Sequence, residues 1–215
     1  MKVKLMMDLF SGLGGASEAF HQRGEWQVYR YENNPLLMDV PRTFDRNVAN
    51  PVHCLPDGDF IRDWDLIWAS PPCREFSNAF GAPGPVAKRN REEFQPDMSL
   101  LRAALRIIQV TQPRYWVIEN VVGAIRHFSP LLGEPRQIIG PFVLWGNFPY
   151  MVDLRDFEHT KANEDVWSDD PLRANKKGKI PLEISEALLN VITAQRQLSE
   201  WVEIRPAVIG FPDLG

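Results

Sequence analysis

One thiol and two carboxyl groups follow apolar runs that read as β-strands. Cys73 comes after two prolines in DLIWASPPCREFS, Glu119 ends the apolar run of WVIENVVGA, and Glu32 follows VYRY in VYRYENNP. A thiol held by stiff prolines is a candidate nucleophile. A carboxyl group beside an apolar strand loses hydration, so it can carry a proton near neutral pH and act as a donor. These residue types therefore predict covalent catalysis assisted by a proton donor.

A glycine-rich turn precedes the first predicted helix, in DLFSGLGGASEAF at residues 8–20. Gly12, Gly14 and Gly15 allow a ligand to approach the backbone and the helix N-terminus. Glu32, at the end of the next strand, is placed to bind ribose hydroxyls of a nucleoside-containing cofactor. Each feature alone has a plainer interpretation: a turn without a ligand, a solvated carboxylate, or a buried cysteine, which is how we interpret Cys54.

Apolar runs alternate with helical periodicity, which is typical of βαβ units that build a mostly parallel sheet flanked by helices. The sequence therefore predicts an α/β, Rossmann-like fold. Strands are expected at 3–8, 26–31, 65–69 and 115–118, two short strands around 142–145, and helices at 16–22, 98–110 and 181–202. Two segments, 76–96 and 153–179, show no periodicity and are expected to be loops.

Composition limits the class of protein. The chain has 215 residues, 44% of them hydrophobic, which suits one globular α/β domain. Its net charge is only −4, so nucleic-acid binding would need local basic patches. Two cysteines make neither a disulfide framework nor a four-thiolate zinc site, and no run of about 18 apolar residues indicates a membrane span. A cytoplasmic protein without a metal is expected.

Four motifs in order carry a family resemblance: DLFSGLGG, ENNP, PPC with FSNA, and ENV. Together they resemble the DNA cytosine C5-methyltransferases. The segment KIPLEISEALLNVI, residues 179–192, is similar to that family's last motif, in which the closing helix packs beside the cofactor turn. GPFVLWGNFP, residues 140–149, is similar to the short members that bacteriophages encode. The resemblance implies the Rossmann-like fold of S-adenosylmethionine-dependent methyltransferases.

The resemblance also implies the cofactor, S-adenosylmethionine, and its binding residues. Glu32 would bind the ribose hydroxyls, Asp59 the adenine amino group, and Pro71 and Pro72 would line the methyl-transfer end. The remaining contacts would come from Phe10, Gly12, Leu13, Gly14, Asn33 and Phe60.

For catalysis, the resemblance implies that Cys73 adds to C6 of a cytosine in DNA. Independently of the resemblance, the adjacent Arg74 is a cation that would favour the Cys73 thiolate. Glu119 would bind N3 and the exocyclic amino group. The target base must be flipped out of the duplex or presented single-stranded. Residues expected to contact nucleic acid are Ser77, Lys88, Arg89 and Arg91 in the first predicted loop, and Arg173, Lys176 and Lys177 in the second.

The chain departs from the family in several places. Arg74 replaces the usual glutamine, the arginine motif that contacts the base has no clean copy, and KKGKIP replaces a segment that contacts the cofactor carboxylate. We expect residues 1–150 to form the catalytic core, 151–179 a reduced DNA-facing segment, and 180–215 a helix and tail that pack back on the core. So short a DNA-facing segment predicts relaxed or very short sequence specificity.

Two alternatives stay open. One is a catalytically silent protein that binds DNA or S-adenosylmethionine, although a silent binder has no need of both Cys73 and Glu119. The other is the same chemistry on RNA or a free cytosine nucleotide. A zinc deaminase fits poorly, because no PCxxC or HxE pattern accompanies the cysteines.

Overall fold

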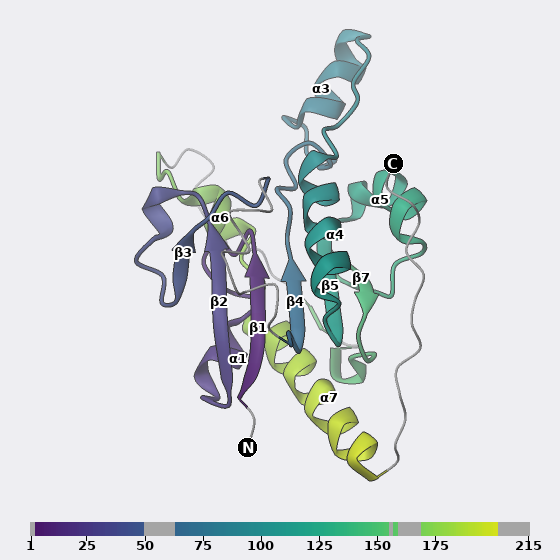
Figure 1. The fold of residues 1–215 in the computed structure, drawn as a ribbon. Coiled ribbons are helices and arrows are strands. Elements are labelled where there is room, and N and C mark those ends of the chain that lie inside the picture. The colour runs from purple at the N-terminus through teal and green to yellow at the C-terminus, as the bar shows by residue number, and fades with distance from the viewer. Residues whose placement is uncertain (1–2, 50–62, 155–156, 159–168, 202–215) are drawn as a thin grey trace.

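The protein is described from a computed structural model, which covers residues 3–49, 63–154, 157–158 and 169–201. Its centre is a seven-stranded sheet in the order β3-β2-β1-β4-β5-β7-β6 (Figure 1). The strands are β1 (Lys4–Leu9), β2 (Trp26–Glu32), β3 (Thr43–Asp45), β4 (Leu66–Ala69), β5 (Tyr115–Val121), β6 (Gln137–Ile139) and β7 (Phe142–Asn147).

The first five strands in the sheet order are parallel, and only β7 runs antiparallel to its neighbours β5 and β6. The parallel strands all start at the end of the sheet where the chain's N-terminus lies, so their carboxyl ends lie together at the opposite end (Figure 1). In open α/β sheets, ligands bind beyond that end. The predicted Rossmann-like, mostly parallel sheet is therefore confirmed.

Helices cover both faces of the sheet. They are α1 (Glu18–Gln22), α3 (Pro83–Asn90), α4 (Ser99–Thr111), α5 (Ile125–Leu132), α6 (Arg173–Lys177) and α7 (Leu182–Trp201), with short 3-10 turns η1 (Pro35–Leu37), η3 (Val122–Ala124) and η4 (Val152–Leu154).

Each face of the sheet has its own apolar cluster. Met6 and Trp68 point toward α1 and α7, whereas the next residue on β1, Met7, points toward α4 and α5 together with Ile67. Adjacent strand residues face opposite sides, so a strand that is covered on both faces is apolar throughout. This explains why the parallel strands appear in the sequence as continuous apolar runs.

The first predicted loop contains a helix. Residues 76–96 were expected to lack secondary structure because of GAPGP, yet α3 begins at Pro83 and carries Pro85 in its first turn, where prolines are tolerated. The helix ends where Arg91 adopts a left-handed conformation, with φ of 59°. It projects beyond the carboxyl ends of the parallel strands (Figure 1). The second predicted loop, 153–179, likewise contains α6.

The strand that carries Glu119 is longer than predicted. It was expected to end at Ile118, but β5 continues to Val121, so Glu119 and Asn120 pair with Leu144 and Val143 of β7. The closing helix begins at Leu182 rather than Pro181. None of the helices in the described ranges is long and apolar enough to cross a membrane.

Candidate active site

The glycine-rich turn connects β1 to α1 and depends on left-handed backbone. Gly12 and Gly14 have φ of 54° and 73°, and the Gly14 amide donates to the Ser11 carbonyl oxygen at 2.8 Å. A Cβ added at Gly14 would lie 2.5 Å from Nε of Arg30. Glycine is therefore required there both for its conformation and for the space it leaves.

Glu32 ties the end of β2 to this turn. One carboxylate oxygen accepts from the Gly12 amide at 2.9 Å, and the other accepts from the amides of Asn33 at 2.9 Å and Asn34 at 3.0 Å. The carboxylate is thus fixed at the carboxyl ends of the strands, next to the half-buried backbone of Gly12. A ligand with vicinal hydroxyl groups could donate hydrogen bonds to a carboxylate held in this way.

A buried charged network supports the turn from below. Asp8 and Arg30 are register neighbours on β1 and β2, and only 1% and 3% of their surfaces are exposed. Ser17 connects them: its hydroxyl donates to Asp8 Oδ2 at 2.6 Å and accepts from Arg30 Nε at 2.8 Å. Arg30 also donates to the carbonyl oxygens of Gly14 and Pro41.

Burial raises the pKa of Asp8 to about 6, while the Ser17 hydrogen bond and the Arg30 charge act in the opposite direction. An arginine that directs all three of its side-chain nitrogens at fixed acceptors holds the backbone rigidly. We infer that Arg30 and Ser17 are positioning residues for the glycine turn.

The segment before α7 closes the other side of the turn. The Asn175 side chain of α6 lies 3.7 Å from where a Gly12 Cβ would be, and a Cβ on Gly15 would collide with the Ile180 carbonyl oxygen. Ser185 of α7 accepts from the Ala19 amide at 3.1 Å and donates to the Ala16 carbonyl oxygen at 2.8 Å. The closing helix thus packs beside the predicted cofactor turn.

The cations of α6 consequently lie near the turn. Arg173 is half-buried and Lys177 is exposed, while Lys176 forms an ion pair with Asp170 at 2.6 Å. Lys179 pairs with Glu18 at 2.8 Å. The structure therefore places this predicted nucleic-acid patch beside the candidate cofactor site, with part of its charge already balanced by carboxylates.

The loop that carries Cys73 is locked to β5. Pro71 is buried, and its carbonyl oxygen accepts from the Asn120 side-chain amide at 2.9 Å. The Phe76 amide donates to the Cys73 carbonyl oxygen at 3.0 Å, and the Phe76 ring packs edge-on against Phe128 with centroids 4.9 Å apart. These contacts form a tight turn that leaves the Cys73 thiol exposed.

Glu119 sits on the same strand as Asn120, with only 8% of its surface exposed. Burial raises its pKa to about 7, and a hydrogen bond with the Ser70 side chain opposes that shift. Ser70 is itself oriented by the Trp68 indole, which donates to its hydroxyl at 2.8 Å. A carboxyl group in this setting is protonated in a substantial fraction of molecules at neutral pH, as its sequence context predicts.

A glycine brings these two motifs together. A Cβ on Gly123, just after β5, would collide with the Phe76 carbonyl oxygen and approach the Asn78 side chain. The Cys73 loop therefore packs directly on the backbone that follows Glu119. This contact and the Asn120–Pro71 hydrogen bond therefore join the loop that carries Cys73 to the end of the strand that carries Glu119.

We expect Gly123→Ala to lower kcat by about 100-fold, because displacing the loop by even about 1 Å misaligns the thiol with its substrate. Binding of S-adenosylmethionine should be unchanged, since Gly123 does not contact the glycine turn. Gly81→Ala is the matched control, because no atom lies within 4 Å of its added Cβ. Steady-state kinetics and calorimetric cofactor titration test this. Equal loss in both variants would contradict it.

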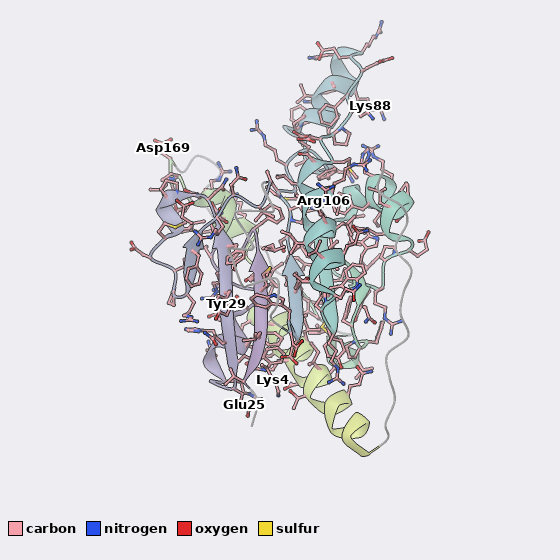
Figure 2. The ribbon with its side chains drawn as sticks, viewed as in Figure 1. Lys4, Glu25, Tyr29, Lys88, Arg106 and Asp169 are labelled. Carbon is pink, nitrogen blue, oxygen red and sulfur yellow. The ribbon has the colours of Figure 1, made fainter. Side chains whose placement is uncertain are left out.

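The basic residues of the first predicted loop lie on or next to α3, with Lys88 on its projecting part (Figure 2). Lys88 and Arg91 are exposed. Arg89 is engaged, because its Nη2 donates to the Phe80 carbonyl oxygen at 2.8 Å. Arg74 is exposed beside Cys73, and the hydroxyl of half-buried Ser77 accepts from the Ala79 amide at 3.1 Å.

The predicted cofactor residues fall into two groups. Phe10, Leu13 and Asn33 lie on the glycine turn or directly after β2, so they stand with Gly12, Gly14 and Glu32 at one edge, and Pro71 follows β4 at the same edge. Asp59 and Phe60, with Cys54, lie outside the described residues.

Several residues that build the site carried weaker signals in the sequence. Arg30 interrupts the apolar run VYRYE, and together with Asp8 it places opposite charges at matching positions of two adjacent strands. That pairing could have indicated the buried network. Ser11 is also buried in the turn, and its hydroxyl has no hydrogen-bond partner among the described residues.

The fold and the site define a class of protein. It is a Rossmann-like domain with a glycine-rich turn after β1, an exposed thiol after β4 and a buried carboxyl group on β5. The family model for the C-5 cytosine-specific DNA methylase matches residues 5–131. The chain belongs to this family.

Curated relatives agree with the assignment. The chain is 30% identical to Type II methyltransferase M1.HphI of Haemophilus parahaemolyticus, over 57% of this chain and 34% of the relative. It is 31% identical to a probable DNA (cytosine-5)-methyltransferase of Frog virus 3, over 54% of this chain and 52% of the relative. Type II methyltransferase M.HgiGI of Herpetosiphon aurantiacus is 29% identical over 54% of this chain and 88% of the relative. The chain thus spans about a third and about half of the first two relatives.

Proposed function

We propose that this protein transfers a methyl group from S-adenosylmethionine to C5 of cytosine in DNA through a covalent bond between Cys73 and C6. The observation that carries the proposal is the fixed Cys73 loop. Asn120 and Gly123 clamp this loop to the strand that bears Glu119, a buried carboxyl group with a pKa of about 7.

The residues of the glycine turn fit the cofactor. Glu32 presents a fixed carboxylate for the ribose hydroxyls, and Gly12 and Gly14 give the turn its left-handed backbone. The Ser11 hydroxyl, which has no partner in the described part of the chain, can bind a polar group of the ligand. Phe10, Leu13, Asn33 and Pro71 complete the set, together with Asp59 and Phe60 of the segment outside the described residues. When bound, S-adenosylmethionine supplies an electrophilic methyl group.

The chain's own residues account for activation of cytosine. C5 is a poor nucleophile, and addition of the Cys73 thiolate to C6 turns it into an enamine carbon. Arg74 places positive charge beside the thiol, which favours its ionised form. Glu119 donates a proton to N3 as the negative charge develops there. After methylation, loss of the C5 proton to solvent expels the Cys73 thiolate and restores the C5–C6 double bond, and N3 returns its proton to Glu119.

DNA is proposed to lie across the carboxyl edge of the sheet, with its target base flipped toward Cys73. The exposed Lys88 and Arg91 suit contacts with phosphates there, and Ser77 and Arg89 belong to the same segment. A second group, Arg173, Lys176 and Lys177 of α6, lies near the glycine turn. We propose residues 1–150 as the catalytic core, 151–179 as the reduced DNA-facing segment, and 180–215 as the part that packs back, although residues 50–62, 159–168 and 202–215 of these ranges lie outside the described residues. Because only residues 148–181 separate β7 from α7, we propose relaxed or very short sequence specificity.

One experiment tests the activity and its substrate. The protein is incubated with methyl-labelled S-adenosylmethionine and, in separate reactions, duplex DNA, single-stranded DNA, RNA and dCMP. We expect label in DNA, and bisulfite sequencing of the product should show methylated cytosines with little shared context. Label only in RNA or dCMP would change the substrate. Binding without transfer to any substrate would indicate a silent binder, and a strict motif of four or more bases would contradict relaxed specificity.

A further inference from the structure

We infer that Phe80 is a nucleobase-stacking residue, which Arg89 holds ready for DNA; this inference rests on the proposed action on DNA. Phe80 is 79% exposed, more than the other large apolar side chains in the described part of the chain. Its own fold gives Phe80 little apolar contact, so packing does not explain the residue.

Arg89 fixes the ring from one side. The guanidinium carbon lies 3.8 Å from the ring centroid, which is a close cation–π contact. The same guanidinium donates to the Phe80 carbonyl oxygen at 2.8 Å, so one side chain orients both the backbone and the ring. A planar cation stacked on an exposed aromatic ring forms two layers of a column that a nucleobase can extend.

The location fits a base close to the reacting cytosine. Phe80 lies between the Cys73 turn and α3, on the loop whose Phe76 carbonyl oxygen packs against Gly123. A turn closed by the Ala82 amide and the Ala79 carbonyl oxygen, 2.9 Å apart, carries the ring. One short loop, held in place by the Phe76–Gly123 contact, therefore carries both the Phe80 ring and the Cys73 thiol.

The surroundings favour a nucleic acid over an apolar protein partner. Exposed polar or cationic residues of the same loop and helix are Asn78, Lys88, Asn90 and Arg91. One further phenyl ring there, that of Phe94, is 36% exposed and lies 3.4 Å from where a Cβ on Gly84 of α3 would be. An exposed aromatic ring on a segment that also carries cations provides stacking and phosphate contacts together, which is the combination that binds nucleic-acid strands. A protein-docking surface would instead need a contiguous apolar patch. Two exposed carboxylates, Glu92 and Glu93, follow Arg91 directly, so the cationic segment ends there.

The test measures DNA binding by fluorescence anisotropy, with fluorescein-labelled cytosine-containing duplex and single-stranded oligonucleotides at several salt concentrations. We expect Phe80→Ala and Phe80→Leu to weaken binding by about 5-fold to 100-fold, the range for loss of one stacked base. Phe80→Trp should bind like the wild type, because it keeps a planar ring. The slope of log Kd against log salt should stay unchanged, whereas Lys88→Gln should reduce it by about one.

Tyr150→Ala is the control, because it removes an aromatic side chain that is 46% exposed at another place on the surface. Wild-type affinity in Phe80→Ala would overturn the inference. Wild-type affinity in Phe80→Leu would overturn it too, because any apolar side chain would then suffice. A reduced salt slope in Phe80→Ala would show that Phe80 acts only by placing Arg89 on a phosphate, which also overturns stacking.

Methyl-transfer assays on the same proteins separate the two proposals. A wild type that transfers methyl groups while Phe80→Ala binds and reacts normally would overturn the stacking role alone. A wild type that binds DNA in a Phe80-dependent way but transfers no methyl group would overturn the proposed activity and support the stacking role. A wild type that binds no DNA would overturn both.

Discussion

Cys73→Ser is expected to lower the rate of methyl transfer by about 1,000-fold or more while leaving the affinity for S-adenosylmethionine unchanged. A serine hydroxyl is barely ionised at neutral pH and is a much weaker nucleophile than a thiolate toward C6 of cytosine. The Cys73 side chain is exposed, and the turn is held by the Cys73 carbonyl oxygen and by Pro71, so the substitution does not disturb the fold. Single-turnover assays with labelled S-adenosylmethionine measure the loss.

Cys54→Ser is the natural control, because Cys54 is the other of the two cysteines in the sequence. DNA that contains 5-fluorocytosine gives a second measurement. Fluorine at C5 blocks the proton loss that expels the thiol, so the wild type should remain bonded to the DNA and show the combined mass. Full activity of Cys73→Ser, or an adduct that persists in that variant, would contradict Cys73 as the nucleophile.

The sheet could be predicted from the sequence because its central strands are buried on both faces. LIWA and YWVI are continuous apolar runs, and the amphipathic spacing of α4 places Leu101, Leu105 and Ile108 on one buried face. Strand β3, by contrast, is three residues long and only half-buried at two of them, so no apolar run marks it. Helix α5 contains Pro130, which obscures its periodicity.

The chemistry at the strand ends could also be predicted, because the motifs lie directly after apolar runs. What holds them in place could not, because it depends on contacts between segments far apart in the chain. Gly123 is required by the Phe76 backbone, and Gly15 by the Ile180 carbonyl oxygen. In the sequence, both are ordinary loop glycines. The burial of Arg30 likewise depends on the register of β1 against β2, so the opposite charges of Asp8 and Arg30 indicate it only once the two strands are paired.

The placement of α6 changes the expected electrostatics of the DNA-binding surface. Lys176 and Lys179 face carboxylates, and Asn175 lies over the glycine turn. Cations that are already paired contribute less to phosphate binding. We therefore assign the larger share of DNA contact to the loop after Cys73 and to α3, whose Lys88 and Arg91 are exposed.

Glu119→Gln is expected to separate activity from stability. The amide cannot donate a proton to N3, so kcat should fall by about 100-fold or more at neutral pH. In the wild type, the protonated fraction of Glu119 falls as pH rises through its pKa of about 7, so its contribution to catalysis is lost above that pH. The pH–rate profile of the wild type should show this decline, and the variant should lack it.

At high pH, Glu119→Gln is expected to raise the free energy of unfolding, although it lowers activity. Burial raises the pKa of Glu119 from 4.5 to about 7, so the unfolded chain loses this proton at a lower pH than the native protein does. The favourable contribution of the neutral carboxyl group is complete below about pH 4.5 and is lost as pH rises through about 7. That loss amounts to about 3 kcal/mol at pH 8.5. A glutamine stays neutral throughout and avoids it.

The variant should consequently match the wild type in free energy of unfolding at pH 4.5 and exceed it at pH 8.5, as urea titrations at both values will show. Asp8, whose burial raises its pKa to about 6, adds its own pH dependence, but it is present in both proteins and cancels in the difference. Glu134→Gln, which removes an exposed carboxyl group, should change neither quantity. A variant no more stable than the wild type at pH 8.5 would mean that Glu119 ionises without penalty, and the proton donor would have to be sought elsewhere.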